Sequence, residues 1–294
     1  MHYLFLCILS STGIFIVFKA LDRFRIPVFP VILINYLLAT LLGFLLNRGK
    51  LDTGEIFGQS WLPLSMAIGI LFILMFFLVG ASTRRAGIST TTVASKMSVV
   101  FPIVFSMIID PSDILTPVKA SAIICALAGV ALTVFRKPAE GGKSLAVALP
   151  LILFIGMGVV DSLVKFSQHR FVGDADTPLF TAVLFLNALS SGLLILIFRS
   201  GELRHFGRSS TWGWGLLLGA VNFGSIFFMM KALNFRNLSA VSGLDSSLVF
   251  GVNNTGIVVL SVLTGLLVFG ERLRPVNWLG IGISILSFIL FSLG

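Results

Sequence analysis

Ten long apolar stretches, separated by short polar connections, limit what this chain can fold into. A helix needs about 20 apolar residues to cross about 30 Å of hydrocarbon, and the stretches cover about residues 3–21, 28–47, 62–81, 88–109, 117–135, 146–167, 177–198, 211–233, 239–268 and 276–293. Their apolar runs are continuous and show no period-two alternation, which excludes a membrane β-barrel. We therefore expect an all-α integral membrane protein.

The composition agrees with this expectation. Of the 294 residues, 56% are hydrophobic and 11% are charged, whereas a soluble domain is about 25% charged. This low charged fraction excludes a water-soluble enzyme. It also excludes a nucleic-acid-binding protein, and the net charge of +9 does not change this because it is dispersed over short loops. No nucleotide-binding, metal-binding or catalytic motif is present. We expect a multi-pass protein of the cell (inner) membrane that is not an enzyme and binds no metal, cofactor or nucleic acid.

The chain repeats itself in three places, in the same order. The matching segments lie 150 to 158 positions apart and are Asn35–Gly49 with Asn187–Gly201, Phe76–Ser89 with Ile226–Ser239, and Leu115–Val118 with Leu273–Val276. These matches divide the chain into two units, 1–138 and 139–294, with five spans in each. Because five is odd, the second unit enters the membrane from the opposite face. Two inverted five-helix repeats, ten transmembrane helices in all, are typical of transporters whose substrate site lies between the repeats near the midplane.

Two groups of motifs resemble those of EamA-like proteins in the drug/metabolite transporter superfamily. Ala81–Ser89 followed by Phe101–Val104 is similar to the signature that joins their third and fourth helices. Phe269–Leu273, followed by Gly280 and Gly282, is similar to the Gly-Glu-Arg-Leu turn and the glycine-bearing last helix of their second repeat. The resemblance covers essentially the whole chain and implies secondary transport of small metabolites, commonly export.

The chain departs from the family pattern in two places. The first repeat has Asp110–Asp113 where a Gly-Glu turn is expected, and the ninth stretch has Gly251–Gly256 where many relatives carry a proline. The resemblance leaves the substrate open, because the superfamily handles amino acids, sugars, cations and phosphorylated compounds.

Three ionisable residues lie well inside apolar stretches: Lys96, Asp161 and Asp245. Such residues cost about 2.5–3.5 kcal/mol at mid-bilayer, so they usually face a partner or a wet cavity. At 1.5 Å per residue, Lys96 lies about 12 Å from one membrane face and both aspartates about 9 Å from the other. We expect Lys96 to hold an anionic group and an aspartate to hold an ammonium group or a coupling proton. A structural ion pair between Lys96 and one aspartate is the alternative.

Neutral polar residues share this zone, and Ser11, Asn222 and Asn253 are further candidates for substrate binding. Hydrogen bonding between helices is the alternative for each. Asn253 and Asn254 are flanked by Gly251 and Gly256, so the ninth helix could unwind there and offer carbonyl groups to a ligand, or only bend.

We therefore predict a secondary active transporter of a small polar metabolite such as an amino acid, which works by alternating access in the lipid bilayer, as a monomer or homodimer. Protons are the expected coupling ion. The alternatives are an exchanger of organic anions or phosphorylated metabolites, a flippase for a lipid-linked carrier, and a scaffold without a substrate.

Loop charge predicts an orientation. Thirteen Lys and Arg residues lie on one face and seven on the other. Since the cytoplasmic side is enriched in Lys and Arg, this predicts both termini outside the cytoplasm, whereas the family resemblance more often implies cytoplasmic termini.

Overall fold

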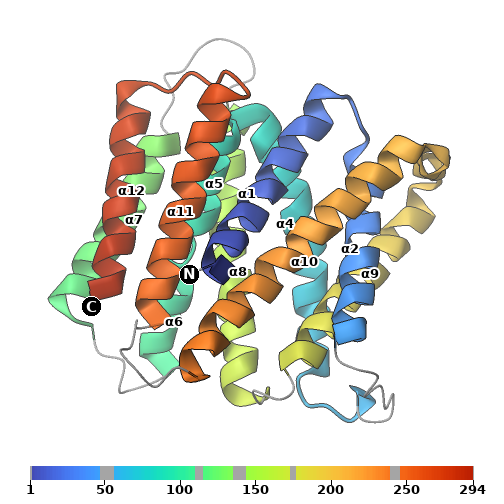
Figure 1. Cartoon of the computed structure of the whole chain (residues 1–294), viewed down its shortest axis with the longest axis horizontal. Coiled ribbons are helices and arrows are strands. Elements are labelled where there is room, and N and C mark those ends of the chain that lie inside the picture. The colour runs from blue at the N-terminus through green and yellow to red at the C-terminus, as the bar shows by residue number, and fades with distance from the viewer. Residues whose placement is uncertain are drawn as a thin grey trace.

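The fold is a bundle of α-helices (Figure 1). The computed structural model describes residues 2–46, 56–109, 115–134, 144–172, 177–238 and 246–293. The elements are α1 (His2–Arg23), α2 (Val28–Leu46), α4 (Leu62–Ala86), α5 (Ile88–Met97), α6 (Val100–Ile109), α7 (Pro117–Val134), α8 (Ser144–Arg170), α9 (Thr177–Phe198), the 3₁₀ helix η1 (Ser200–Gly207), α10 (Ser209–Leu238), α11 (Ser246–Leu267) and α12 (Pro275–Leu293).

Within these ranges, nine helices are long and apolar enough to cross a membrane. One of the nine, Ile88–Phe105, takes α5 together with the start of α6, and α11 contributes a shorter apolar segment, Gly251–Leu267. In a bilayer every backbone polar group must be satisfied internally, which long helices achieve. The chain is a multi-pass membrane protein, as the sequence predicts.

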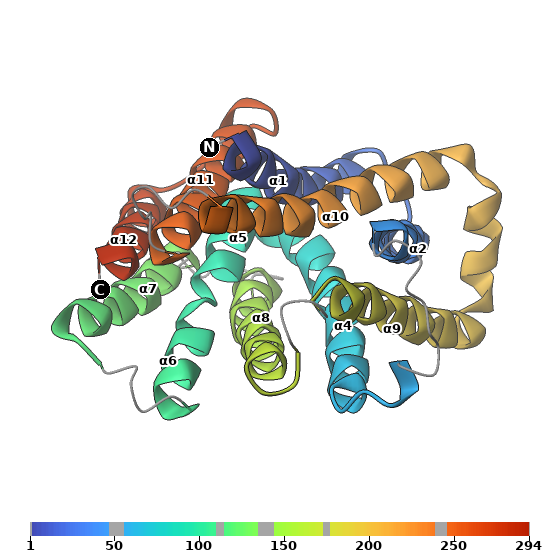
Figure 2. The same cartoon turned by 60° about the horizontal axis from the view of Figure 1, so that its bottom comes forward.

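The helices pack in a regular set of pairs. α1 packs on α10 and α11, α2 on α10 and α9, α4 on α8 and α9, and α7 on α12. Between these pairs, α5 contacts α8, α11 and α7, and α12 also contacts α11. In the tilted view of Figure 2, α8 lies between α6 and α4.

The predicted fourth span, 88–109, is not one helix but two. α5 ends at Met97, and α6 begins at Val100 after a turn at Ser98 and Val99. Pro102 supplies the reason, because proline has no N–H to donate to the carbonyl of Ser98, and its ring disfavours a continuous helix through that position.

The ninth stretch shows the opposite outcome. α11 passes through Asn253 and Asn254 without interruption, so the structure does not show the unwinding that was one of the two alternatives for this segment. The flanking glycines serve helix packing instead. A Cβ on Gly251 would collide with Ser292 of α12, and one on Gly256 would lie 2.5 Å from Ile8 of α1. Small residues commonly permit such close helix contacts in membranes.

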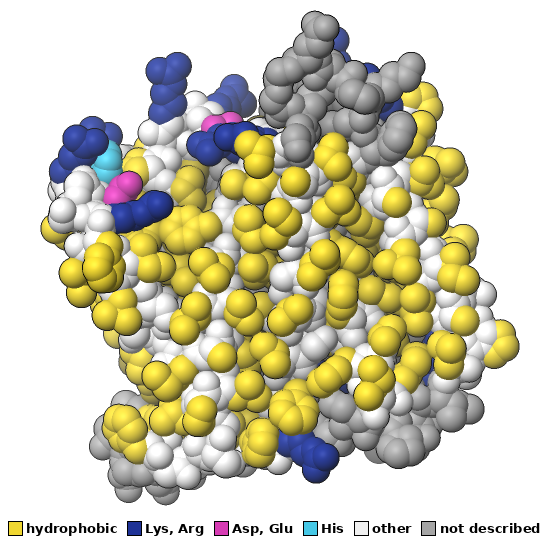
Figure 3. All heavy atoms as spheres, turned by 180° about the vertical axis from the view of Figure 1, so that it is seen from behind, with side chains coloured by type: hydrophobic (Ala, Val, Ile, Leu, Met, Phe, Trp, Pro, Cys, Tyr) yellow, Lys and Arg dark blue, Asp and Glu magenta, His cyan; other side chains and the backbone are white. Residues whose placement is uncertain are grey.

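Charge is concentrated at one end of the bundle, here called the basic end. It contains the last turns of α1 and α4, the 3₁₀ helix η1 and the first turn of α12. Seen from behind (Figure 3), hydrophobic side chains cover the middle of the molecule and most of the visible Lys and Arg gather at one end. This is the surface expected of a bundle surrounded by lipid.

Candidate functional site

The break between α5 and α6 places polar groups inside the bundle. Phe101 N–H donates to the Ser98 carbonyl at 3.0 Å, which replaces the bond that Pro102 cannot make. The Ser98 hydroxyl lies 2.6 Å from the Ser95 carbonyl and 3.3 Å from Asp161 Oδ2 of α8. Broken helices at membrane depth are tolerated where they are buried in protein or line a cavity. The break is therefore the first element of the candidate site.

Lys96 and Asp161, both predicted as site residues, lie near this break. Lys96 is in the last turn of α5, Asp161 is in α8, and the two charges are close enough to interact electrostatically. Both side chains are partly buried. In the part of the chain that the structure describes, no ion pair at contact distance joins them. A lysine and an aspartate that attract each other without contact can hold a solute that carries both charges.

Helix α1 forms another side of this cluster. Cys7 lies within electrostatic reach of Lys96 and is hydrogen-bonded to the side chain of Ser11, a predicted site residue. The Cys7 thiol also donates to the Ser225 carbonyl of α10 at 3.2 Å. Ser11 is buried, with 6% of its surface exposed. The structure thus brings Lys96, Asp161 and Ser11 into one region, formed by α1, α5 and α8.

Asn222, a predicted site residue, makes a hydrogen bond between helices, the alternative given for it above. Its side-chain N–H donates to Asn35 Oδ1 of α2 at 3.0 Å, and both residues are buried. Asn187 of α9 forms an equivalent bond to Ser65 Oγ of α4, at 2.9 Å. Such bonds hold helices together in a membrane. The alternative of a bond between helices therefore describes Asn222 better than a direct contact with substrate.

Several buried polar atoms lack a hydrogen-bond partner among the described residues. Three of them, Thr12 Oγ1, Thr92 Oγ1 and Asn253 Oδ1, belong to α1, α5 and α11, which pack against one another. An unpaired polar atom is costly in an apolar interior. These atoms therefore have hydrogen-bonding capacity that water or a polar solute would satisfy. Asp245, the remaining predicted site residue, lies outside the described residues.

A carboxylate caps the N-terminus of α5, which lies at the basic end of the bundle. Glu271, in the turn between α11 and α12, accepts hydrogen bonds from the backbone N–H groups of Ile88 and Ser89 and from the Ser89 hydroxyl. A carboxylate at a helix N-terminus satisfies free N–H groups and is favoured by the helix dipole. Gly87 and Gly265 allow this approach, because a Cβ on either would lie 2.6 Å from a Glu271 oxygen.

Sequence reasoning missed three of these features. Pro102 was a usable signal for the break, because a proline inside an apolar run interrupts a helix. Nothing in the neighbourhood of Cys7 along the chain indicates its contact with α10. The Glu271 turn was quoted for its family resemblance, but its contact with α5 spans 182 positions and no local pattern predicts it.

Comparison with known proteins adds a relative but no described function. No family model matches the sequence. An "Uncharacterized protein" of Haemophilus influenzae is 30% identical over 288 residues, which is 96% of this chain and 94% of that protein. The chain belongs to the same family as this protein. A solved crystal structure is similar with a TM-score of 0.59 at 16% identity, over 98% of this chain and 96% of that one, and this likeness shows the fold alone.

Proposed function

We propose that the chain is a secondary active transporter of a small polar metabolite, similar to the EamA-like members of the drug/metabolite transporter superfamily. It would work by alternating access in the inner membrane, with protons as the coupling ion, and export is the expected direction. The observation that carries the proposal is the helix break at Ser98, beside which Lys96 and Asp161 interact electrostatically without a contact ion pair among the described residues.

The packing of the helices supports two inverted repeats of five spans. Under such a repeat α1, α2, α4, α5 with α6, and α7 correspond in turn to α8, α9, α10, α11 and α12. Exchanging the two sets converts the α1–α10 contact into α8–α4, α2–α10 into α9–α4, and α11–α12 into α5–α7, all of which are present. The pairs α2–α9, α5–α11 and α7–α12 map onto themselves. Contacts that are preserved by this exchange are expected of a duplicated transporter fold.

The chemistry of the site favours a zwitterionic substrate, such as an amino acid. The Lys96 ammonium would bind a carboxylate, and Asp161, supported by the Ser98 hydroxyl at 3.3 Å, would bind an ammonium group or a proton. The buried hydroxyl groups of α1 and α5 would hydrogen-bond to the polar parts of the solute. None of these contacts is covalent, so the substrate could dissociate from the site, as transport requires.

An exchanger of organic anions or phosphorylated metabolites is the second candidate. It is favoured by the Lys96 ammonium, which has no hydrogen-bond acceptor at contact distance among the described residues. In this case Lys96 would hold the anion, and Asp161 would serve only for proton binding or structure. The two candidates differ in the effect of Asp161→Asn, which should abolish exchange of a zwitterion but leave binding of an anion.

A counterflow assay tests the proposal. The purified chain is reconstituted in liposomes loaded with pooled metabolites, and the uptake of each labelled compound is compared with that of empty liposomes. Saturable exchange of an amino acid supports the first candidate, and saturable exchange of a phosphorylated compound supports the second. Transfer of a labelled lipid between leaflets, without exchange of a soluble compound, would contradict both and indicate a flippase. No movement of either would indicate a scaffold.

A further inference from the structure

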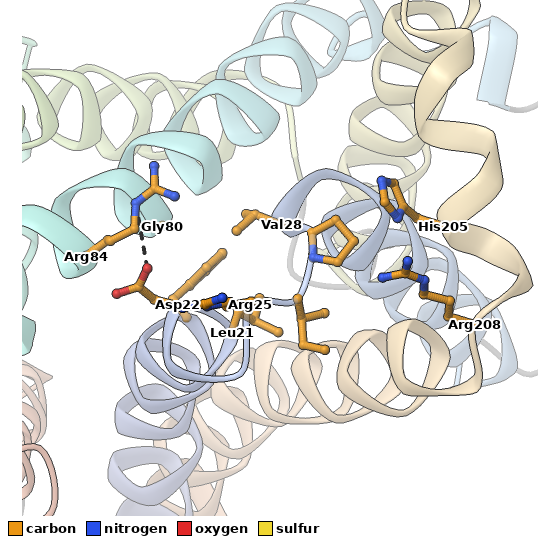
Figure 4. A pocket seen from close by; sticks show the side chains of 11 residues that line it. Leu21, Asp22, Arg25, Val28, Gly80, Arg84, His205 and Arg208 are labelled. Atoms are coloured by element: carbon orange, nitrogen blue, oxygen red, sulfur yellow. Dashed lines mark ion pairs between the residues drawn. The ribbon is translucent and has the colours of Figure 1, made fainter.

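A polar cavity lies at the basic end, and its lining contains none of the residues of the candidate transport site. It has a volume of about 300 Å³ and is lined by residues of α1, α2, α4 and η1, of the turn between α1 and α2, and by Arg208 between η1 and α10. Arg25, Arg84, Arg208 and His205 contribute its basic side chains, and Asp22 its one carboxylate. We call this cavity the arginine pocket. Figure 4 shows Asp22 and Arg84 on one side, with His205 and Arg208 on the other.

Arg25 occupies an unusual backbone position in this pocket. Its φ of 54° lies in the left-handed region, and it is the one non-glycine residue with a positive φ in the described chain. The turn is a Schellman motif, in which Ile26 N–H donates to the Leu21 carbonyl at 2.9 Å and Arg25 N–H donates to the Asp22 carbonyl at 3.2 Å. Glycine is the usual residue at this position because a Cβ is strained there. An arginine at this strained position is consistent with a role of its side chain in the pocket.

The positive charge of the pocket is only partly balanced. Asp22 lies 3.9 Å from Arg84, with 38% and 52% of the two side chains exposed, so this pair is loose and solvated. It leaves the guanidinium groups of Arg25 and Arg208 without a carboxylate in the pocket lining. His205 Nε2 lies 3.9 Å from Glu202 Oε2, a carboxylate outside the pocket lining, and the buried Nδ1 atom of His205 lacks a hydrogen-bond partner among the described residues. A pocket of this kind is complementary to an anion with several oxygen atoms.

Part of the pocket lining is apolar, and two aromatic residues near the pocket indicate the level of the membrane surface. Leu21, Ile26 and Val28 are among its apolar lining residues. The ring of Phe24, which is 59% exposed, lies 5.7 Å from the ring of Trp214. Tryptophan is enriched at the boundary between lipid and water. The arginine pocket therefore combines a basic rim with an apolar wall at the height of the lipid head groups.

We propose that the arginine pocket binds a phosphate group at the bilayer surface, carried either by the head group of an anionic lipid or by a soluble phosphate compound. The guanidinium group of arginine matches phosphate oxygens in geometry and charge. Basic pockets between membrane helices bind anionic head groups. Arg25 and Arg208 supply the principal contacts, and Arg84 exchanges its loose pairing with Asp22 for the ligand. This site does not depend on the transport activity proposed above.

Two titrations distinguish the sources of the phosphate. The purified full chain is titrated with inorganic phosphate in lipid-free detergent and with phosphatidylglycerol in mixed micelles, with phosphatidylcholine as the neutral comparison, and the thermal midpoint is followed. Stabilisation by phosphatidylglycerol but not by inorganic phosphate identifies a lipid site, and the reverse identifies a soluble ligand. Stabilisation by neither would overturn the proposal.

Variants then assign the effect to the pocket. Arg208→Gln should weaken the binding by at least about tenfold, because a charge-assisted contact is lost. Arg25→Gly should weaken it similarly while raising the thermal midpoint without ligand, since glycine relieves the strained turn. Arg272→Gln removes an exposed charge from the same end outside the pocket lining and should leave binding unchanged. Equal affinity in all three variants would overturn the proposal, since it would show a general effect of surface charge.

Discussion

Glu271 Oε2 accepts a hydrogen bond of 2.8 Å from the Ser89 hydroxyl, although the two residues lie 182 positions apart. Through this contact the turn between α11 and α12 closes over the first turn of α5 at the basic end. Under the proposed transport function, this contact would break when access alternates.

Glu271→Gln should lower the free energy of unfolding by about 1–3 kcal/mol, the cost of leaving a buried donor unsatisfied. Glutamine has the shape of glutamate, but its amide nitrogen would face an N–H or O–H donor of Ile88 or Ser89, and the attraction to the helix dipole is lost. Denaturant unfolding in detergent measures the change. Asp22→Asn is the control, because its pairing with Arg84 at 3.9 Å is exposed and should contribute less than about 1 kcal/mol. Equal losses in the two variants would contradict the capping role.

Pro102→Ala should join α5 and α6 into a more continuous helix. Alanine supplies the N–H that Pro102 lacks, and this group can donate to the Ser98 carbonyl in place of Phe101 N–H. The thermal midpoint should therefore rise or stay constant, while the transport rate falls at least about tenfold because the groups at the break shift. Pro150→Ala removes a second proline inside a helix, in α8, and serves as the control. Should both variants transport at the wild-type rate, the break would have no role in transport.

Two glycines of α12 test the packing of this helix against α7. A Cβ on Gly280 of α12 would lie 2.5 Å from the Thr133 backbone nitrogen and 2.8 Å from the Gly129 carbonyl oxygen of α7, whereas one on Gly282 would meet nothing within 4 Å. Gly280→Ala should thus destabilise the protein by about 1–3 kcal/mol through overpacking. Gly282→Ala should stabilise it by about 0.5–1 kcal/mol. Thermal unfolding of both variants gives the comparison, and the same sign for both would contradict the described α7–α12 contact.

The charge distribution predicts that the basic end faces the cytoplasm and that both termini lie outside it. Single cysteines in a chain with Cys7 and Cys125 replaced by serine can report this. A cysteine at exposed Arg204 of η1 should resist a membrane-impermeant thiol reagent in intact cells, and one at exposed Ser121 of α7 should react. Labelling at 204 and protection at 121 would reverse the orientation, in agreement with the family resemblance instead.

The sequence was most informative where the physics is local or additive. The need for about 20 apolar residues per crossing predicts the helices, and counting residues from the span ends predicts that Lys96 can approach Asp161. The helix break was misplaced because glycines at 251 and 256 were weighed as hinges, while Pro102 was not considered. The Glu271 cap and the bond between Asn222 and Asn35 could not be predicted, because they depend on how distant helices pack.

The most direct test of the central claim is substrate exchange by Lys96→Gln and Asp161→Asn in the counterflow assay, beside the wild type and the Pro150→Ala control. Each variant should retain the wild-type circular dichroism spectrum and thermal midpoint within a few degrees. The account predicts saturable amino-acid exchange by the wild type and the control, and its loss in both charge variants. Exchange at the wild-type rate by folded Lys96→Gln and Asp161→Asn would contradict it.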